Sequence, residues 1–109
     1  MTKTELEKLA RRHGIQVFYW NFPDPLKAVL IPENDSVVLG ITYNNPSDII
    51  TFAEAIGFYV CGFLKDVPVK FYSYDRQTLT PEFYTAIQWG VKTLLPQSLM
   101  VELIEQYGY

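Results

Sequence analysis

The chain has 109 residues, of which 49% are hydrophobic and 19% are charged, and its formal net charge is −3. This apolar content suffices for one domain with a packed core, so an intrinsically disordered chain is excluded. An acidic domain lacks the basic surface that phosphate binding needs, and direct binding of nucleic acid is therefore disfavoured.

The first predicted element is a helix. Thr4 and Glu7 have the spacing of a capping box, and Gly14 marks the point where the helix should end. The basic residues Arg11 and Arg12 fall in the last turn, where positive charge favours the helix dipole. We therefore expect a capped N-terminal helix.

Three strands are predicted after this helix, at residues 15–22, 27–31 and 36–43. These segments are rich in β-branched and aromatic residues, the composition that fits a pleated, half-buried surface. Turn-forming residues at 32–35 separate the second and third segments, which predicts that these two strands form a hairpin.

The second half of the chain reads mainly as helix. Ser47 or Asp48 can cap a long central helix over 49–63, in which apolar residues recur at helical spacing. Residues 69–72 fit either a short strand or an extended loop. A Thr-Pro pair then predicts the start of a helix over 80–95.

One more helix is predicted over 98–107, with Ser98 as its cap. The order of elements indicates a single α+β domain over residues 1–109. We expect a small three-stranded, mostly antiparallel sheet packed against the long central helix. An N-terminal helix and two C-terminal helices complete the predicted fold.

Cysteine content and hydropathy bear on the compartment. Cys61 is the single cysteine, so no disulfide can form within the chain, which fits a reducing compartment. The most apolar stretch, about residues 56–64, is too short to cross a bilayer, and no apolar signal run follows Met1. We therefore expect a cytoplasmic domain that makes no contact with a membrane.

Three separated segments resemble the ImmA/IrrE family of zincin-like metallopeptidases. Arg12-His13-Gly14-Ile15 is similar to the phrase that ends the family's first helix. The central helix carries Ile50-Thr51-Phe52-Ala53-Glu54-Ala55-Ile56-Gly57-Phe58-Tyr59, where the family has Phe-Thr-x-Ala-His-Glu-Leu-Gly-His-His. A later stretch, residues 83–90 with the Leu-Leu-Pro that follows at 94–96, is similar to the family's third helix.

The resemblance implies that this chain has lost the family's catalytic chemistry. Active members use a His-Glu-x-x-His helix, in which two histidines bind zinc and the glutamate activates a water. Glu54 stands at the first histidine position, Ala55 at the base, Phe58 at the second histidine and Phe83 at the third ligand. We therefore expect no catalytic residue, no metal ligand and no cofactor.

A family member without these ligands is expected to keep a recognition groove. Tyr59, Glu82 and Tyr84 are the residues we expect to line it. Family members act on helix-turn-helix repressors in bacteria and their mobile elements. The resemblance thus implies a zincin-like, non-catalytic protein-binding module in phage or mobile-element transcription regulation, whose partner is a regulatory protein such as a repressor.

Two alternatives remain open at the level of sequence. Glu54 and Glu82 are candidates for a carboxylate site in an enzyme of another class. The high aromatic content, 16% of residues, also suits a structural subunit that associates with copies of itself. The sequence indicates neither the identity of the partner nor the oligomeric state.

Overall fold

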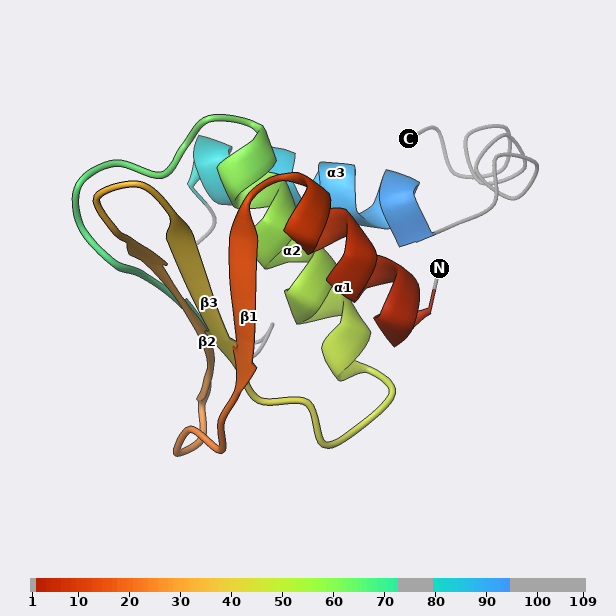
Figure 1. Ribbon diagram of the computed structural model, residues 1–109. Coiled ribbons are helices and arrows are strands. Elements are labelled where there is room, and N and C mark those ends of the chain that lie inside the picture. Colours follow the sequence, from red (N-terminus) through yellow and green to blue (C-terminus); the bar gives the residue numbers. More distant parts are fainter. Residues whose placement is uncertain (1, 73–79, 95–109) are drawn as a thin grey trace, which may run out of the picture.

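The computed structural model describes residues 2–72 and 80–94 of the chain (Figure 1). These ranges contain the following helices and strands in chain order: α1 (Lys3–Arg12), β1 (Ile15–Tyr19), β2 (Leu26–Pro32), β3 (Val37–Ile41), α2 (Asp48–Val60), β4 (Val69–Tyr72) and α3 (Pro81–Leu94). The helix predicted over 98–107 lies outside the described residues.

The four described strands form one mixed sheet in the order β1-β3-β2-β4. β1 pairs parallel to β3, and β2 pairs antiparallel to both β3 and β4. The prediction of a three-stranded, mostly antiparallel, zincin-like arrangement is therefore wrong. β3 lies between β2 and β1. The chain reverses direction after β1 and again in the predicted hairpin of β2 and β3, so β1 and β3 run parallel. β4 extends the sheet beyond β2.

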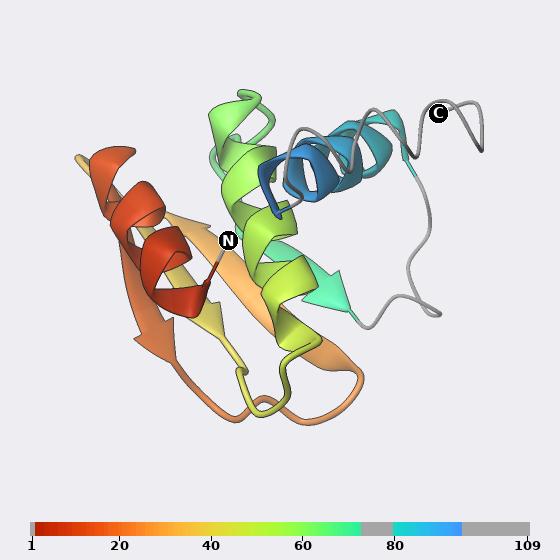
Figure 2. The same ribbon diagram turned by 90° about the vertical axis from the view of Figure 1, so that its right-hand side faces the viewer.

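The described helices lie on one side of this sheet. Figure 2 shows α1 and α2 in front of the strands, with α3 crossing α2 on the side away from the sheet. The buried side chains alternate along the strands, as in β3, where Val37, Leu39 and Ile41 are buried and the residues between them are not. The core lies between this face and the two helices that cover it.

Helix α1 begins two residues earlier than predicted. Thr2 is its N-cap, and Thr2 and Glu5 form a reciprocal capping box through hydrogen bonds of 3.2 and 3.0 Å. Gly14 follows the helix with a φ of +78°, a conformation that side chains other than glycine rarely adopt. The chain can therefore turn directly from α1 into β1.

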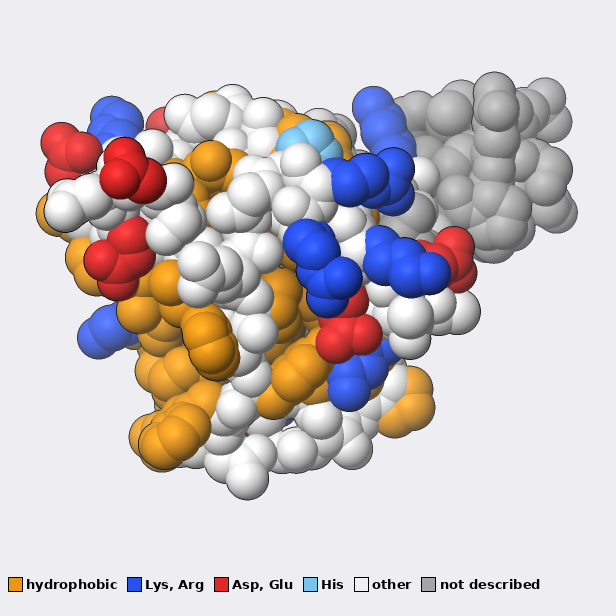
Figure 3. All heavy atoms as spheres, in the orientation of Figure 1, with side chains coloured by type: hydrophobic (Ala, Val, Ile, Leu, Met, Phe, Trp, Pro, Cys, Tyr) orange, Lys and Arg blue, Asp and Glu red, His pale blue; other side chains and the backbone are white. Residues whose placement is uncertain are grey.

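The opposite face of the sheet is mainly apolar and is partly exposed. It carries the side chains that alternate with the core residues, among them Phe18, Val29, Ile31 and Val38. Figure 3 shows hydrophobic side chains gathered over the strands. No helix within the described ranges is long and apolar enough to cross a membrane.

Candidate functional site

The structure brings together two of the positions that the resemblance assigns to metal ligands. Phe58 lies in the last turns of α2 and Phe83 in the first turn of α3, and their ring centroids are 5.2 Å apart. Phe71 from β4 lies 5.6 Å from Phe58 and 5.5 Å from Phe83. Phe63 lies 5.6 Å from Phe58. We call these four residues the phenylalanine cluster.

Within the cluster, the three ring pairs other than Phe58 and Phe83 meet edge to face. This geometry places the positive edge of one ring against the negative face of the next. Phe71 is fully buried and Phe58 is 5% exposed. The space between α2, α3 and β4 is therefore filled by packed aromatic side chains.

Two glycines let α2 and α3 approach closely beside this cluster. A Cβ atom at Gly57 would lie 2.6 Å from Cε3 of Trp89 and 3.1 Å from the backbone oxygen of Ala86. A Cβ atom at Gly90 would lie 3.3 Å from the backbone nitrogen of Glu54. The absence of side chains at these two positions thus fixes how near the helices come.

The two carboxylates of the alternative enzyme site occupy different environments. Glu54 is buried in the middle of α2, with 1% of its surface exposed, and its backbone adjoins Gly90. Glu82 is exposed in the first turn of α3, eight residues before Gly90 and thus about 12 Å from it along the helix axis. Ala55 is fully buried beside Glu54.

The residues expected to line a groove are also placed by the structure. Tyr59 is half-buried near the end of α2, and Tyr84 is exposed on α3 next to Glu82. Across the described residues, no group of three or more histidine, cysteine, aspartate or glutamate side chains is arranged to hold a metal ion.

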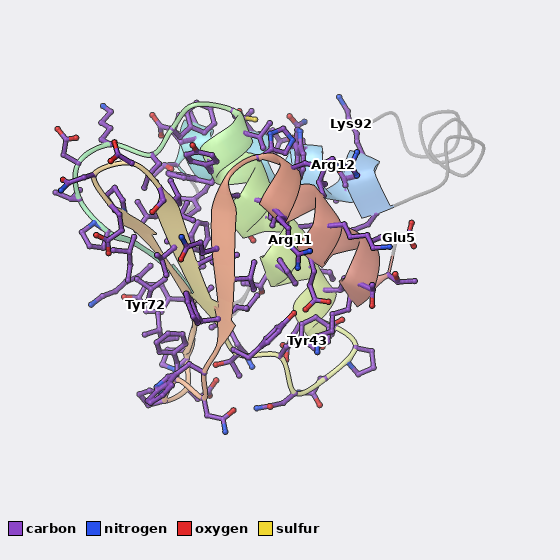
Figure 4. All side chains as sticks on the ribbon, viewed as in Figure 1. Glu5, Arg11, Arg12, Tyr43, Tyr72 and Lys92 are labelled. Carbon is purple, nitrogen blue, oxygen red and sulfur yellow. The ribbon has the colours of Figure 1, made fainter. Side chains whose placement is uncertain are left out.

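A surface pocket of about 440 Å³ lies at the other end of α2, by the carboxyl ends of the parallel strands β1 and β3. Three aromatic side chains and two amides line it: Tyr19, Trp20, Asn21, Tyr43 and Asn44. Figure 4 labels Tyr43 at this end of the sheet, near the start of α2. Sequence reasoning missed this pocket, although the consecutive aromatic residues at 18–20 were a signal for it.

Helix α1 borders the pocket with one positive and one negative group. The Lys3 ammonium lies 4.3 Å from the ring centroid of Tyr19 and 5.0 Å from that of Tyr43, which is cation–π geometry. The Tyr19 hydroxyl donates a hydrogen bond of 2.7 Å to Glu7. Burial first, and then this hydrogen bond, raise the pKa of Tyr19 far above its ordinary value.

A buried carboxylate next to the pocket accepts hydrogen bonds from the backbone at and beside Asn44. Asp48, 5% exposed at the start of α2, accepts hydrogen bonds of 2.8 and 3.0 Å from the backbone of Asn44 and Asn45. The Lys27 ammonium lies 3.6 Å from its other oxygen. Burial, together with the nearby charge of Asp48, raises the pKa of Tyr43. These contacts join the Asn44 side of the pocket to the start of α2 and to β2.

No family model, curated protein sequence or solved structure matches this chain.

Proposed function

We propose that this chain is a non-catalytic binding module derived from an ImmA/IrrE-like peptidase, and that it binds a regulatory protein of the helix-turn-helix repressor class in phage or mobile-element control. One observation carries the proposal. Phe58 and Phe83, which the resemblance places at metal-ligand positions on separate helices, meet in space with ring centroids 5.2 Å apart.

Two positions far apart in sequence thus converge, as the ligands of a zinc site must, but with side chains that cannot ligate. A catalytic zinc ion needs three nitrogen, oxygen or sulfur donors and an open position for water. The phenylalanine cluster offers neither donors nor space at Phe58 and Phe83. The position of the general base is occupied by the buried Ala55. These features support the loss of catalysis.

The surface supports a binding role as well. Large aromatic side chains at the end of β1 are exposed, Phe18 by 57% and Trp20 by 68%. Exposed aromatic residues of this size are enriched where proteins meet one another, because they bring large contact area at a small cost in side-chain entropy. Trp20 also lines the pocket at the ends of the parallel strands.

The test is to isolate the tagged chain from its host, to identify the proteins bound to it, and to measure binding with the purified partner. We expect one helix-turn-helix repressor to bind saturably, and we expect its mass to stay unchanged after long incubation with the chain and added zinc. A partner cut by the chain would refute the loss of catalysis. Recovery of no regulatory protein would refute the assignment of the partner.

A further inference from the structure

We propose that the outer edge of β1, which pairs with no strand within residues 2–72 and 80–94, binds an extended segment of a partner protein in which apolar and acidic residues alternate. The segment adds a fifth strand to the sheet. This inference names a surface for the proposed binding function and rests on that function only for the existence of a partner.

The first argument concerns the backbone of β1, which is an end strand of the sheet (Figure 2). The N–H of Trp20 donates to Ile41 of β3 at 2.9 Å. Because successive residues of a strand direct their N–H groups to opposite sides, the N–H groups of Val17 and Tyr19 point away from β3. Unpaired groups in a row are a template for another strand.

The second argument is that this edge carries none of the usual protection. Natural end strands are commonly guarded by charged residues, especially lysine, or by proline. β4, at the opposite end of the sheet, has the exposed Lys70 among its four residues. The run 15–20 has no charged residue and no proline. Of the two edges of the described sheet, β1 is therefore the one that can accept a further strand without the desolvation of a charge.

The third argument gives the chemistry of the occupant. An added strand presents alternate side chains to the two faces of the sheet. On one face it continues the apolar surface of Phe18 and Trp20, so apolar side chains belong there. On the other face it runs beside α1, where Lys3, Glu7 and Arg11 lie on one side of the helix, four residues apart.

The charge on α1 favours acidic residues on that second face. Helix α1 carries four basic residues and two acidic residues, a net charge of +2 within a chain whose total is −3. Figure 3 shows these basic side chains beside the hydrophobic surface of the strands, and Figure 4 labels Arg11 on α1 close to β1. Glu7 is engaged by the Tyr19 hydroxyl, which leaves positive charge to face the added strand.

The same charge argues against a second copy of this chain as the occupant. In a two-fold dimer through antiparallel β1 strands, the same surface of both copies meets itself. The two α1 helices would then lie side by side on one face of the joined sheet, and their like charges would repel. The geometry therefore favours an acidic partner over self-association.

The experiment is a selection from a displayed library of random peptides of about ten residues, long enough for one strand, on the immobilised full chain. We expect enriched peptides to alternate apolar and acidic residues. Their binding should weaken by about tenfold or more on Trp20→Ala, and also on Val17→Pro, which removes an outward N–H. Val67→Ala, in the loop before β4, is the matched control for an apolar residue that is as exposed (63%) and should leave binding unchanged.

Folding and charge are controlled separately. Val17→Ala keeps the N–H that Val17→Pro removes, so a loss confined to the proline variant reports the backbone bond. Arg11→Glu should weaken binding and flatten its salt dependence, whereas Lys70→Glu on the opposite edge should not. Thermal unfolding followed by circular dichroism verifies that each variant is folded. If Val17→Pro is unfolded, the test rests on the binding measured for Trp20→Ala.

Three outcomes would overturn the proposal: no enriched peptide, enriched peptides that bind Trp20→Ala as well as wild type, or a dimer in sedimentation that Trp20→Ala abolishes. The proposed function can fail separately. A captured repressor that binds Trp20→Ala normally would refute this edge but keep the function. Peptides that bind the edge, together with the absence of a regulatory partner in the host, would support this edge but refute the proposed function.

Discussion

Replacement of Gly57 by alanine should destabilise the protein, although alanine is the better helix former. In a free helix, Gly→Ala stabilises by about 1 kcal/mol. At Gly57 the new methyl would lie 2.6 Å from Trp89 and 3.1 Å from the Ala86 backbone oxygen, so α3 must move away. Overpacking of this kind costs about 1–3 kcal/mol. The gain and the cost together leave a net loss of about 1 kcal/mol, and more if the phenylalanine cluster opens.

Gly90→Ala is the matched control. It gains the same helix propensity, but its methyl would meet the Glu54 nitrogen at 3.3 Å, which a shift of a few tenths of an ångström relieves. We expect it to be close to neutral, within about 1 kcal/mol. Urea unfolding followed by circular dichroism gives both free energies, with equal m-values as a check that the unfolded states match.

A third variant locates the clash. In a Trp89→Ala background the ring that Gly57 adjoins is gone, so Gly57→Ala should lose part of its cost, and the difference between backgrounds is the coupling energy. Stabilisation of the wild type by Gly57→Ala, by the amount expected of a free helix, would refute the close approach of α2 and α3.

Three further outcomes are expected. Because the pKa of Tyr19 is raised in the folded state, its contribution to stability is present below about pH 10 and declines as pH rises beyond that value; urea midpoints across this range should fall less steeply for Tyr19→Phe, and equal slopes would contradict the shift. Phe71→Ala should lower the free energy of unfolding in urea by about 3–5 kcal/mol because the residue is fully buried among aromatic rings. Tyr72→Ala, at a half-buried position of the same strand, should lower it clearly less, and equal losses would argue against the cluster. Asp48→Ala should cost about 1–3 kcal/mol because it leaves two backbone N–H donors without an acceptor, and Asp48→Asn should recover much of that loss in thermal unfolding; no loss in either variant would rule out this anchor.

Local sequence patterns located most helices and strands and one hairpin, but not the other strand pairings. The segments predicted at 27–31 and 36–43 contain β2 and β3, and their hairpin is confirmed by the antiparallel register. The parallel pairing of β1 with β3 joins Tyr19 to Ile41, and no local pattern reports so distant a partner. The segment at 69–72 was ambiguous by itself and becomes β4 because β2 offers it an edge.

The start of α1 shows how tertiary contacts choose between equal local signals. The sequence holds two overlapping capping boxes, one from Thr2 to Glu5 and one from Thr4 to Glu7. The structure uses the first, while Glu7 accepts a hydrogen bond from Tyr19, twelve residues away. No local sequence pattern indicates that Glu7 forms this long-range hydrogen bond.

The candidate site also has one part that could be predicted from the sequence and one part that could not. The resemblance relates Phe58 to Phe83, and the structure brings these two residues together. The aromatic residues of the pocket come from strand ends that meet only in the folded sheet, and each alone is typical of a core residue. The run of aromatic residues at 18–20 was a signal for a surface, but no local pattern relates Tyr19 to Tyr43.

The mixed sheet also fixes an order of events during folding. The hairpin of β2 and β3 is local and can form within microseconds, as hairpins do. β1 has no partner until β3 is in place, because β3 is the only described strand that it pairs with. During synthesis, the uncharged run 15–20 therefore leaves the ribosome well before the strand that will pair with it. A nascent chain in which residues 15–20 have emerged while β3 is still inside the ribosome should accordingly recruit chaperones at this run, and one in which β3 has also emerged should release them.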